Sequence, residues 1–184
     1  MKAVFLDRDG TINREVDVLQ DVRQLRLLPG AAQAIKKLNQ SQYLVVVITN
    51  QPVIARGWLT EKEVDHIHDV LIRRLAKRGA KIDATYYCPH HPNANLKKYR
   101  VRCRCRKPGI GMIEKAVREL GINLRASWVI GDSGRDVATG KRAGSKTILV
   151  ATGYGGKDID CGAQPDFVAR NLLAAVRIIK QHAK

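Results

Sequence analysis

The chain has 184 residues, 45% of them hydrophobic, and it carries a formal net charge of +16. This length suits one domain with a complete core, and the apolar content excludes an intrinsically disordered chain. No stretch is long and apolar enough to cross a bilayer, and the first residues lack the features of a signal peptide. We therefore predict a single domain over residues 1–184, in a soluble cytoplasmic protein that has no membrane contact. The positive charge favours anionic partners, such as phosphorylated metabolites or nucleic acid.

The first predicted strand, residues 2–6, leads directly into Asp7 and Asp9, which Gly10 and Thr11 follow. Ligands of open parallel sheets bind at the carboxyl ends of strands, and a glycine there allows a turn that brings both carboxylates to one ligand. Two neighbouring carboxylates repel each other unless a cation lies between them, and Mg²⁺ prefers oxygen ligands. The segment therefore predicts a magnesium site, although the same spacing also occurs in ordinary surface turns.

Strands and helices alternate through the rest of the chain. Pro29 and Gly30 open a helix, and the continuous apolar run over residues 43–48 predicts a central strand that is buried on both faces. Thr60 and Glu63 form a capping box at the start of the next helix. Further strands are predicted over residues 84–87, 127–130, 147–150 and 166–169. Further helices are predicted over residues 109–120, 135–143 and 171–182. This alternation predicts an α/β fold with a doubly wound parallel sheet.

Other predicted strands also end in reactive side chains. Thr49 and Asn50 follow the second strand, Asp132 follows the strand over 127–130, and Lys107 stands just before a helix. Because the carboxyl ends of parallel strands share one edge, we expect these groups to meet the first two aspartates there. The set contains neither a Ser-His-Asp or Cys-His arrangement nor a phosphate-binding P-loop. It fits phosphoryl transfer, in which a carboxylate can attack phosphorus directly.

The segment over residues 88–107 has no regular pattern and contains a second group of metal-ligand residues. Loops of this length in compact domains are usually functional or held by something. Three cysteines and one histidine could complete a tetrahedral zinc site, and four protein ligands indicate a structural metal. The predicted ligands are Cys88, His90, Cys103 and Cys105. His91 is an alternative to His90, and reduced surface cysteines beside an unrelated histidine are the alternative to zinc.

Taken together, the sequence resembles the haloacid dehalogenase superfamily of phosphatases over nearly the whole chain. Within the superfamily, it resembles most the phosphatases that act on a bisphosphorylated heptose or on histidinol phosphate. The matching segments are Leu6-Asp7-Arg8-Asp9-Gly10-Thr11-Ile12-Asn13, Thr49-Asn50-Gln51 with Ala55-Arg56-Gly57, Tyr87-Cys88-Pro89-His90-His91-Pro92, Cys103-Arg104-Cys105-Arg106-Lys107-Pro108, and Gly131-Asp132 with Asp136. The resemblance implies a Rossmann-type sheet without a separate cap domain, and a zinc ion that holds the loop over residues 88–107.

The resemblance also implies a role for each matching residue. Asp7 would be the nucleophile and a ligand of Mg²⁺, and Asp132 would be a further ligand. Asp9 would be the general acid and base, with a raised pKa, and would bind the metal through its backbone carbonyl. The residues implied to bind the phosphoryl group or the rest of the substrate are Thr49, Asn50, Arg106 and Lys107. The implied activity is Mg²⁺-dependent hydrolysis of a sugar phosphate, such as the bisphosphorylated heptose, through an aspartyl-phosphate intermediate.

Some positions depart from the family pattern, and other functions stay open. Pro52 and Val53 stand where the family has Ser-Gly, and Ser133 stands where a basic residue can occur. Asp136 is either part of the site or a carboxylate that stabilises a helix start. Histidinol phosphate or another small phosphate ester is the alternative substrate. A nucleic-acid-binding protein or nucleic-acid end phosphatase is the less favoured alternative, because aromatic residues for base stacking are few. We expect a monomer whose partner is a small phosphorylated substrate, and we interpret Cys161 as a thiol without a role.

Overall fold

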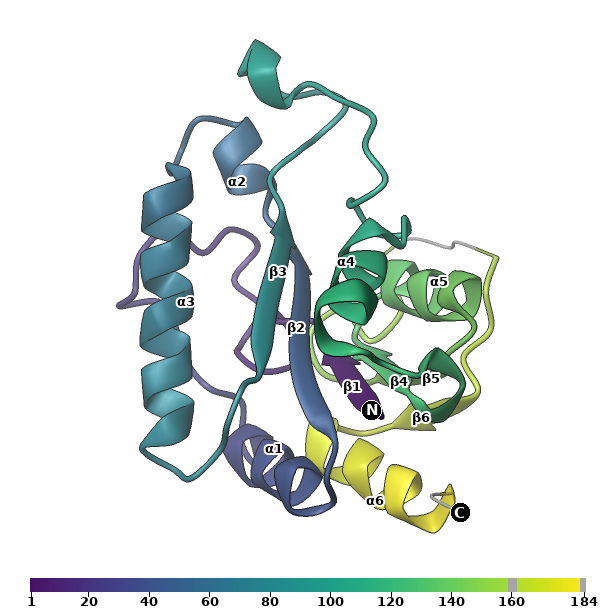
Figure 1. Ribbon diagram of the computed structural model, residues 1–184. Helices are drawn as coiled ribbons and strands as arrows, with labels where there is room; N and C mark the ends of the chain where they lie inside the picture. The colour runs from purple at the N-terminus through teal and green to yellow at the C-terminus, as the bar shows by residue number, and fades with distance from the viewer. Residues whose placement is uncertain (159–161, 183–184) are drawn as a thin grey trace.

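The computed structural model describes residues 1–158 and 162–182, so Cys161 lies outside the described residues. Six parallel strands form one sheet in the order β3-β2-β1-β4-β5-β6 (Figure 1). The strands are β1 (Ala3–Leu6), β2 (Leu44–Asn50), β3 (Ala84–Cys88), β4 (Trp128–Gly131), β5 (Lys146–Val150) and β6 (Phe167–Ala169). The prediction of a doubly wound parallel sheet is confirmed, because strand order reverses between β1 and β4 and helices cover both faces.

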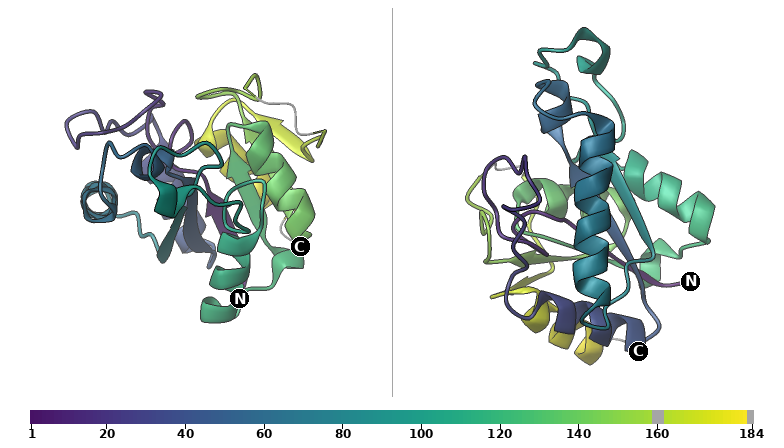
Figure 2. Two further views of the ribbon diagram at one scale, coloured as in Figure 1. Left: turned by 90° about the horizontal axis from the view of Figure 1, so that it is seen from above. Right: turned by 90° about the vertical axis from the view of Figure 1, so that its left-hand side faces the viewer.

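The helices pack on the sheet in two layers, as the view from above in Figure 2 shows. One face is covered by α1, α3 and α6, and the other by α4 and α5. The α-helices are α1 (Ala31–Gln40), α2 (Pro52–Ala55), α3 (Glu61–Ala76), α4 (Gly111–Leu120), α5 (Gly134–Ala143) and α6 (Leu172–His182). The short 3₁₀ helices are η1 (Lys97–Tyr99) and η2 (Leu124–Ala126). Among the described helices, none combines the length and the apolar character needed to span a bilayer.

The core explains why the strands read as continuous apolar runs. Successive strand side chains alternate between the faces, so Val4 and Leu6 of β1 pack in the cluster beneath α1, α3 and α6. Ala3 and Phe5 pack in the cluster beneath α4. Because both faces are covered, no position of β1 is polar, and the first charged residue comes where the strand ends.

Two local features differ from the sequence prediction. Strand β2 continues through Thr49 to Asn50, because both residues still pair with β3, so Thr49 lies within the strand instead of in a turn. The unpredicted helix α2 begins at Pro52, which suits a first helical position because it needs no N–H there. Pro52 therefore starts a short helix directly after the second strand.

The predicted helix signals are otherwise confirmed. Thr60 and Glu63 form the reciprocal capping box at the start of α3. Ser133 and Asp136 form a second capping box at the start of α5, which follows β4 after a two-residue turn. Asp136 therefore does stabilise a helix start, which was one of its two predicted roles, because its carboxylate accepts a hydrogen bond from the backbone N–H of Ser133.

Candidate active site

A cleft of about 220 Å³ lies at the carboxyl ends of β1, β2 and β4, at the point where the strand order reverses. All seven residues that the sequence assigns to magnesium, catalysis or substrate line it. They are Asp7, Asp9, Thr49, Asn50, Arg106, Lys107 and Asp132. Three strand ends and the end of the loop over residues 88–107 therefore contribute to one site, as the shared edge of a parallel sheet requires.

Lys107 lies at the centre of the charged groups in this cleft. Its ammonium is 3% exposed and contacts Asp7 Oδ2 at 2.9 Å, Asp136 Oδ1 at 2.5 Å and the carbonyl oxygen of Ile48 at 3.1 Å. Burial disfavours the charged form, but the carboxylates of Asp136 and Asp7 hold the pKa of Lys107 above its ordinary value. Lys107 therefore stays cationic beside the predicted nucleophile, where it can neutralise an incoming phosphoryl oxygen.

Asn50 fixes the backbone of Lys107 instead of pointing freely into the cleft. Its side-chain oxygen accepts a hydrogen bond from the Lys107 N–H at 3.0 Å, and its amide nitrogen donates to the Lys107 carbonyl oxygen at 3.2 Å. Both halves of the amide are therefore occupied. The geometry favours a positioning role for Asn50, beside the substrate contact that the sequence predicts.

Asp132 and Asp7 form an acidic pair with a neighbouring third carboxylate. The carboxylate oxygens of Asp7, Asp132 and Asp136 lie within 4.8 Å of one another. Burial and the charge of Asp7 raise the pKa of Asp132 to about 8, although the backbone N–H of Tyr154 donates to its Oδ2 at 2.7 Å. Such a set of destabilised carboxylates fits a hard divalent cation. Lys107 offsets part of this negative charge, because its ammonium contacts both Asp7 Oδ2 and Asp136 Oδ1.

Asp9 is held as an anion by four hydrogen bonds. Its Oδ1 accepts from Arg8 Nε at 3.0 Å and Asn13 Nδ2 at 2.8 Å, and its Oδ2 accepts from Arg8 at 2.5 Å and Gln51 Nε2 at 3.1 Å. Burial favours the neutral acid, but Arg8 and the two amides hold the pKa of Asp9 below its ordinary value. A raised pKa was expected for Asp9 from the sequence; the shift has the opposite direction, because the Arg8 side chain folds back onto the Asp9 carboxylate.

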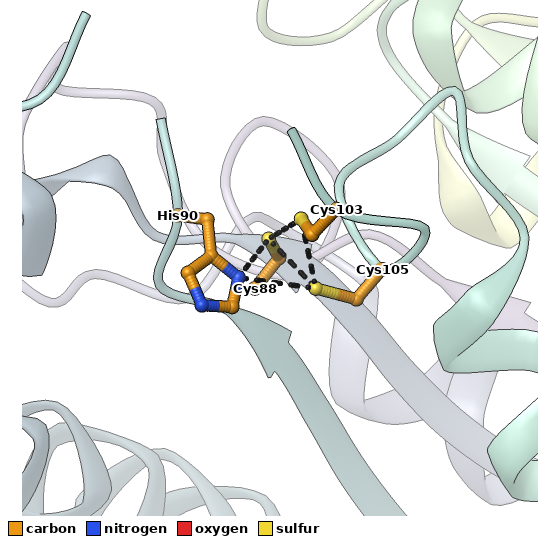
Figure 3. A group of neighbouring side chains, drawn as sticks. All are labelled: Cys88, His90, Cys103 and Cys105. Atoms are coloured by element: carbon orange, nitrogen blue, oxygen red, sulfur yellow. Dashed lines mark hydrogen bonds between the residues drawn. The ribbon is translucent and has the colours of Figure 1, made fainter. Parts of the chain in front are cut away.

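The four predicted zinc residues come together at the base of the loop over residues 88–107, where their side chains point at a common centre (Figure 3). The three Sγ atoms lie 3.1–3.4 Å apart. His90 Nδ1 lies 3.7 Å from Cys88 Sγ and 3.4 Å from Cys105 Sγ. The nitrogen–sulfur separations bracket the roughly 3.6 Å edge that zinc bond lengths give in a tetrahedron, and the sulfur–sulfur separations are shorter than the roughly 3.8 Å edge. His91 turns away, since its Nδ1 accepts from the Asn93 N–H at 3.1 Å.

Sequence reasoning gave no role in the cleft to several of its basic residues. Arg56, His91 and Arg135 line it together with Arg106. Arg135, in the first turn of α5, donates to Asp158 Oδ2 at 3.1 Å and from Nε to Ser133 Oγ at 3.3 Å. Arg56 and His91 belong to segments that matched the family, and these matches were the available signals. Arg135 occupies a position where a surface charge is ordinary.

This fold, with an aspartate pair after β1, a lysine salt-bridged to the first aspartate and an acid after β4, defines a haloacid-dehalogenase-type phosphatase. A family model described as HAD-hydrolase-like matches residues 104–175. The chain belongs to the family of D-glycero-D-manno-heptose-1,7-bisphosphate 7-phosphatases, which are phosphoric monoester hydrolases.

Three relatives support this assignment. The heptose-bisphosphate phosphatase of Rhodopseudomonas palustris is 42% identical over 158 residues, which cover 86% of each chain. That of Pasteurella multocida is 37% identical over 182 residues, 97% of each chain. The crystal structure of D,D-heptose 1,7-bisphosphate phosphatase from B. bronchiseptica, complexed with magnesium and phosphate, is 35% identical and superposes with a TM-score of 0.87 over both whole chains.

The space for Asp132 depends on glycines, which gives a first prediction. A Cβ on Gly153 would lie 2.0 Å from Asp132 Oδ2 and 2.7 Å from the Gly10 Cα, and the φ of Gly153 is +58°. We expect Gly153→Ala to displace the Asp132 carboxylate and lower kcat/KM by on the order of 100-fold. Gly155→Ala is the matched control, because φ there is +57° and the nearest atom is the Ala151 carbonyl oxygen at 3.2 Å. Equal losses of kcat/KM in both variants would show that backbone strain, and not the displacement of Asp132, causes the loss.

Proposed function

We propose that the chain is a Mg²⁺-dependent phosphatase that removes the 7-phosphate of D-glycero-D-manno-heptose 1,7-bisphosphate. The observation that carries the chemistry is the buried ammonium of Lys107 at 2.9 Å from Asp7, beside the Asp132 carboxylate. The identity of the sugar substrate is inferred from the names of relatives that match 86–97% of the chain. We also propose that residues 1–184 form one domain and that the monomer is the working unit.

In the proposed reaction, Asp7 attacks the phosphorus of the 7-phosphate and forms an aspartyl phosphate. Lys107 and the Thr49 hydroxyl bind the phosphoryl oxygens, while Asp9 delivers a proton to the departing sugar oxygen. Asp9 then takes a proton from the water that releases phosphate from Asp7. The anionic state of Asp9 suits its role as a base toward water in the second step. In the first step Asp9 acts as an acid, so its carboxylate must take up a proton as the substrate binds.

Magnesium would be held by the Asp7 and Asp132 carboxylates and by the backbone carbonyl of Asp9. When bound, it would supply positive charge that offsets the phosphate and keeps both carboxylates ionised. The raised pKa of Asp132 without a cation is consistent with such a need. Gly10 lets the chain pass close to Asp132, since a Cβ there would lie 2.1 Å from Asp132 Oδ2.

We further propose that zinc occupies the Cys88, His90, Cys103 and Cys105 cluster and shapes the substrate contact. Arg106 NH1 donates to the His90 carbonyl oxygen at 3.1 Å, so a zinc ligand holds a cleft residue directly. Lys107 follows in the chain. A structural zinc would therefore fix where both cationic side chains point.

The cations of the cleft support a bisphosphorylated substrate over a monophosphate. Burial and the neighbouring charges of Arg135 and Arg56 lower the pKa of Arg106. Among the described residues, neither Arg106 nor Arg56 forms an ion pair with a carboxylate, so their charges are open to a substrate anion. Arginine pairs with phosphate through two parallel hydrogen bonds. We therefore assign the 1-phosphate to the side of the cleft formed by these arginines.

A panel of phosphate esters with Mg²⁺ tests the substrate. We expect kcat/KM for the heptose 1,7-bisphosphate to exceed that for histidinol phosphate and for a 5′-phosphorylated oligonucleotide by about 100-fold or more, as two charged hydrogen bonds allow. Arg106→Gln should lower the preference for the bisphosphate over heptose 7-phosphate and leave the rate on simple esters nearly unchanged. Similar rates across the panel would refute the sugar assignment and leave the phosphatase chemistry standing.

A further inference from the structure

Arg8 is a buried charge beside the cleft to which the proposed mechanism gives no task. Its side chain is 1% exposed, and each of its three nitrogens has a partner. Nε and one terminal nitrogen bind the two oxygens of Asp9 at 3.0 and 2.5 Å. The other terminal nitrogen lies 3.1 Å from Nε2 of His68. A buried guanidinium needs such complete pairing, since each unpaired donor would be costly.

The contact with His68 has only one possible direction. Arginine has donors and no acceptor, so Nε2 of His68 must accept, and His68 is neutral with its proton on Nδ1. Burial, together with the charge of Arg8, lowers the pKa of His68 to about 3, which agrees with this state. His68 is 5% exposed and projects from α3, which lies along one face of the sheet (Figure 1). A helix outside the cleft therefore reaches Asp9 through one arginine.

The orientation of Asp9 depends on this arginine more than on its other partners. Arg8 binds both carboxylate oxygens and so fixes the plane of the carboxylate, whereas Asn13 and Gln51 each bind one oxygen. Without the acceptor on His68, a terminal nitrogen of Arg8 would be buried without a partner. The guanidinium would then turn to find one, and the Asp9 carboxylate would turn with it.

We propose that His68 is a positioning residue, which through Arg8 sets the orientation from which Asp9 transfers a proton to the leaving oxygen. This inference rests on the proposed role of Asp9. A proton-transfer group contributes about 10²–10⁴-fold to the rate. If Asp9 is misplaced, the rate should therefore fall most for esters whose leaving group must be protonated and least for esters whose leaving group departs as a stable anion.

The test compares His68→Leu, which removes the acceptor, with His68→Gln, whose side-chain oxygen can still accept from Arg8. Each is assayed as kcat/KM on the best alkyl phosphate of the panel and on p-nitrophenyl phosphate, whose leaving group departs without a proton. We expect His68→Leu to lose about 100-fold on the alkyl ester and only a few-fold on the aryl ester. His68→Gln should stay within a few-fold of the parent on both esters, and Asp9→Asn should show the pattern of His68→Leu.

Controls separate positioning from stability. Leu75→Ala, on the same face of α3 and fully buried, should lower the unfolding temperature without a difference between the two esters. Equal losses on both esters in His68→Leu, or equal losses in the Leu and Gln variants, would overturn the proposal. If His68→Leu does not fold, His68→Asn replaces it, since its shorter amide leaves the acceptor out of reach. A uniform loss in Asp9→Asn would remove Asp9 from proton transfer and overturn the inference, while the phosphatase assignment would stand.

Discussion

Asp7→Asn should abolish phosphatase turnover, with a loss on the order of 10⁵-fold or more, the scale on which removal of a covalent nucleophile acts. An amide is a poor nucleophile toward phosphorus and carries no charge for a divalent cation. The fold should survive, because Lys107 keeps its 2.5 Å contact with Asp136 and its hydrogen bond to the Ile48 carbonyl oxygen. The measurement is kcat on the best ester of the panel, with thermal unfolding of the same preparation.

Asp17→Asn is the matched control for this change. Asp17 also lines the cleft, and its φ of +57° is one that asparagine tolerates well. The same exchange of a carboxylate for an amide should there leave kcat within a few-fold. Appreciable turnover by correctly folded Asp7→Asn, free of the parent protein, would remove Asp7 from the nucleophile role.

Loss of the zinc ligand Cys105 should cost both stability and activity. In the loop over residues 88–107, Ala94 and Tyr99 pack in a small cluster with α2 and Val64, and the three cysteines pack beside the cluster beneath α4. A metal that joins the cysteines to His90 would therefore supply much of the order of the loop. We expect Cys105→Ser to lower the unfolding temperature by about 10 °C or more, and to raise KM as Arg106 loses the fixed His90 carbonyl. Elemental analysis of the parent protein should find one zinc per chain.

Exchange of each histidine distinguishes the two candidate ligands. His90→Gln should lose the zinc, whereas His91→Gln should keep one zinc per chain, because His91 Nδ1 already accepts a backbone hydrogen bond. Zinc content is the decisive readout, since His91 also lines the cleft and its exchange can affect the rate. A preparation free of zinc that is fully active and equally stable would contradict the role proposed for the metal.

The sequence predicted the fold well because its signals are local. Apolar runs, a capping box and glycines at helix ends mark each element without knowledge of its neighbours. The gathering of Asp7, Lys107 and Asp132 was also predictable, because parallel strands must end at one edge. The two one-residue spacings of the cysteine and histidine pairs predicted the metal cluster in the same way.

The remaining features depend on contacts between distant segments, which no local pattern carries. Arg8 and His68 are 60 positions apart, and the sequence around neither residue indicates their contact. The direction of the Asp9 pKa shift was missed for another reason, because it depends on how the neighbouring Arg8 and Asn13 side chains fold back onto the Asp9 carboxylate. Arg135 resembles an ordinary exposed residue of a helix start in the sequence, and its contact with Asp158, 23 positions away, was not predictable.

The two hydrogen bonds between Asn50 and Lys107 concern only the main chain of residue 107. The place of this residue in the cleft is therefore set independently of the side chain that it carries. A protein engineer could exchange that side chain for a shorter, longer or unnatural amine and still expect it to leave the backbone from the same point. Position 107 therefore offers one fixed backbone point, from which cationic side chains of different lengths can be compared at different distances from the nucleophile.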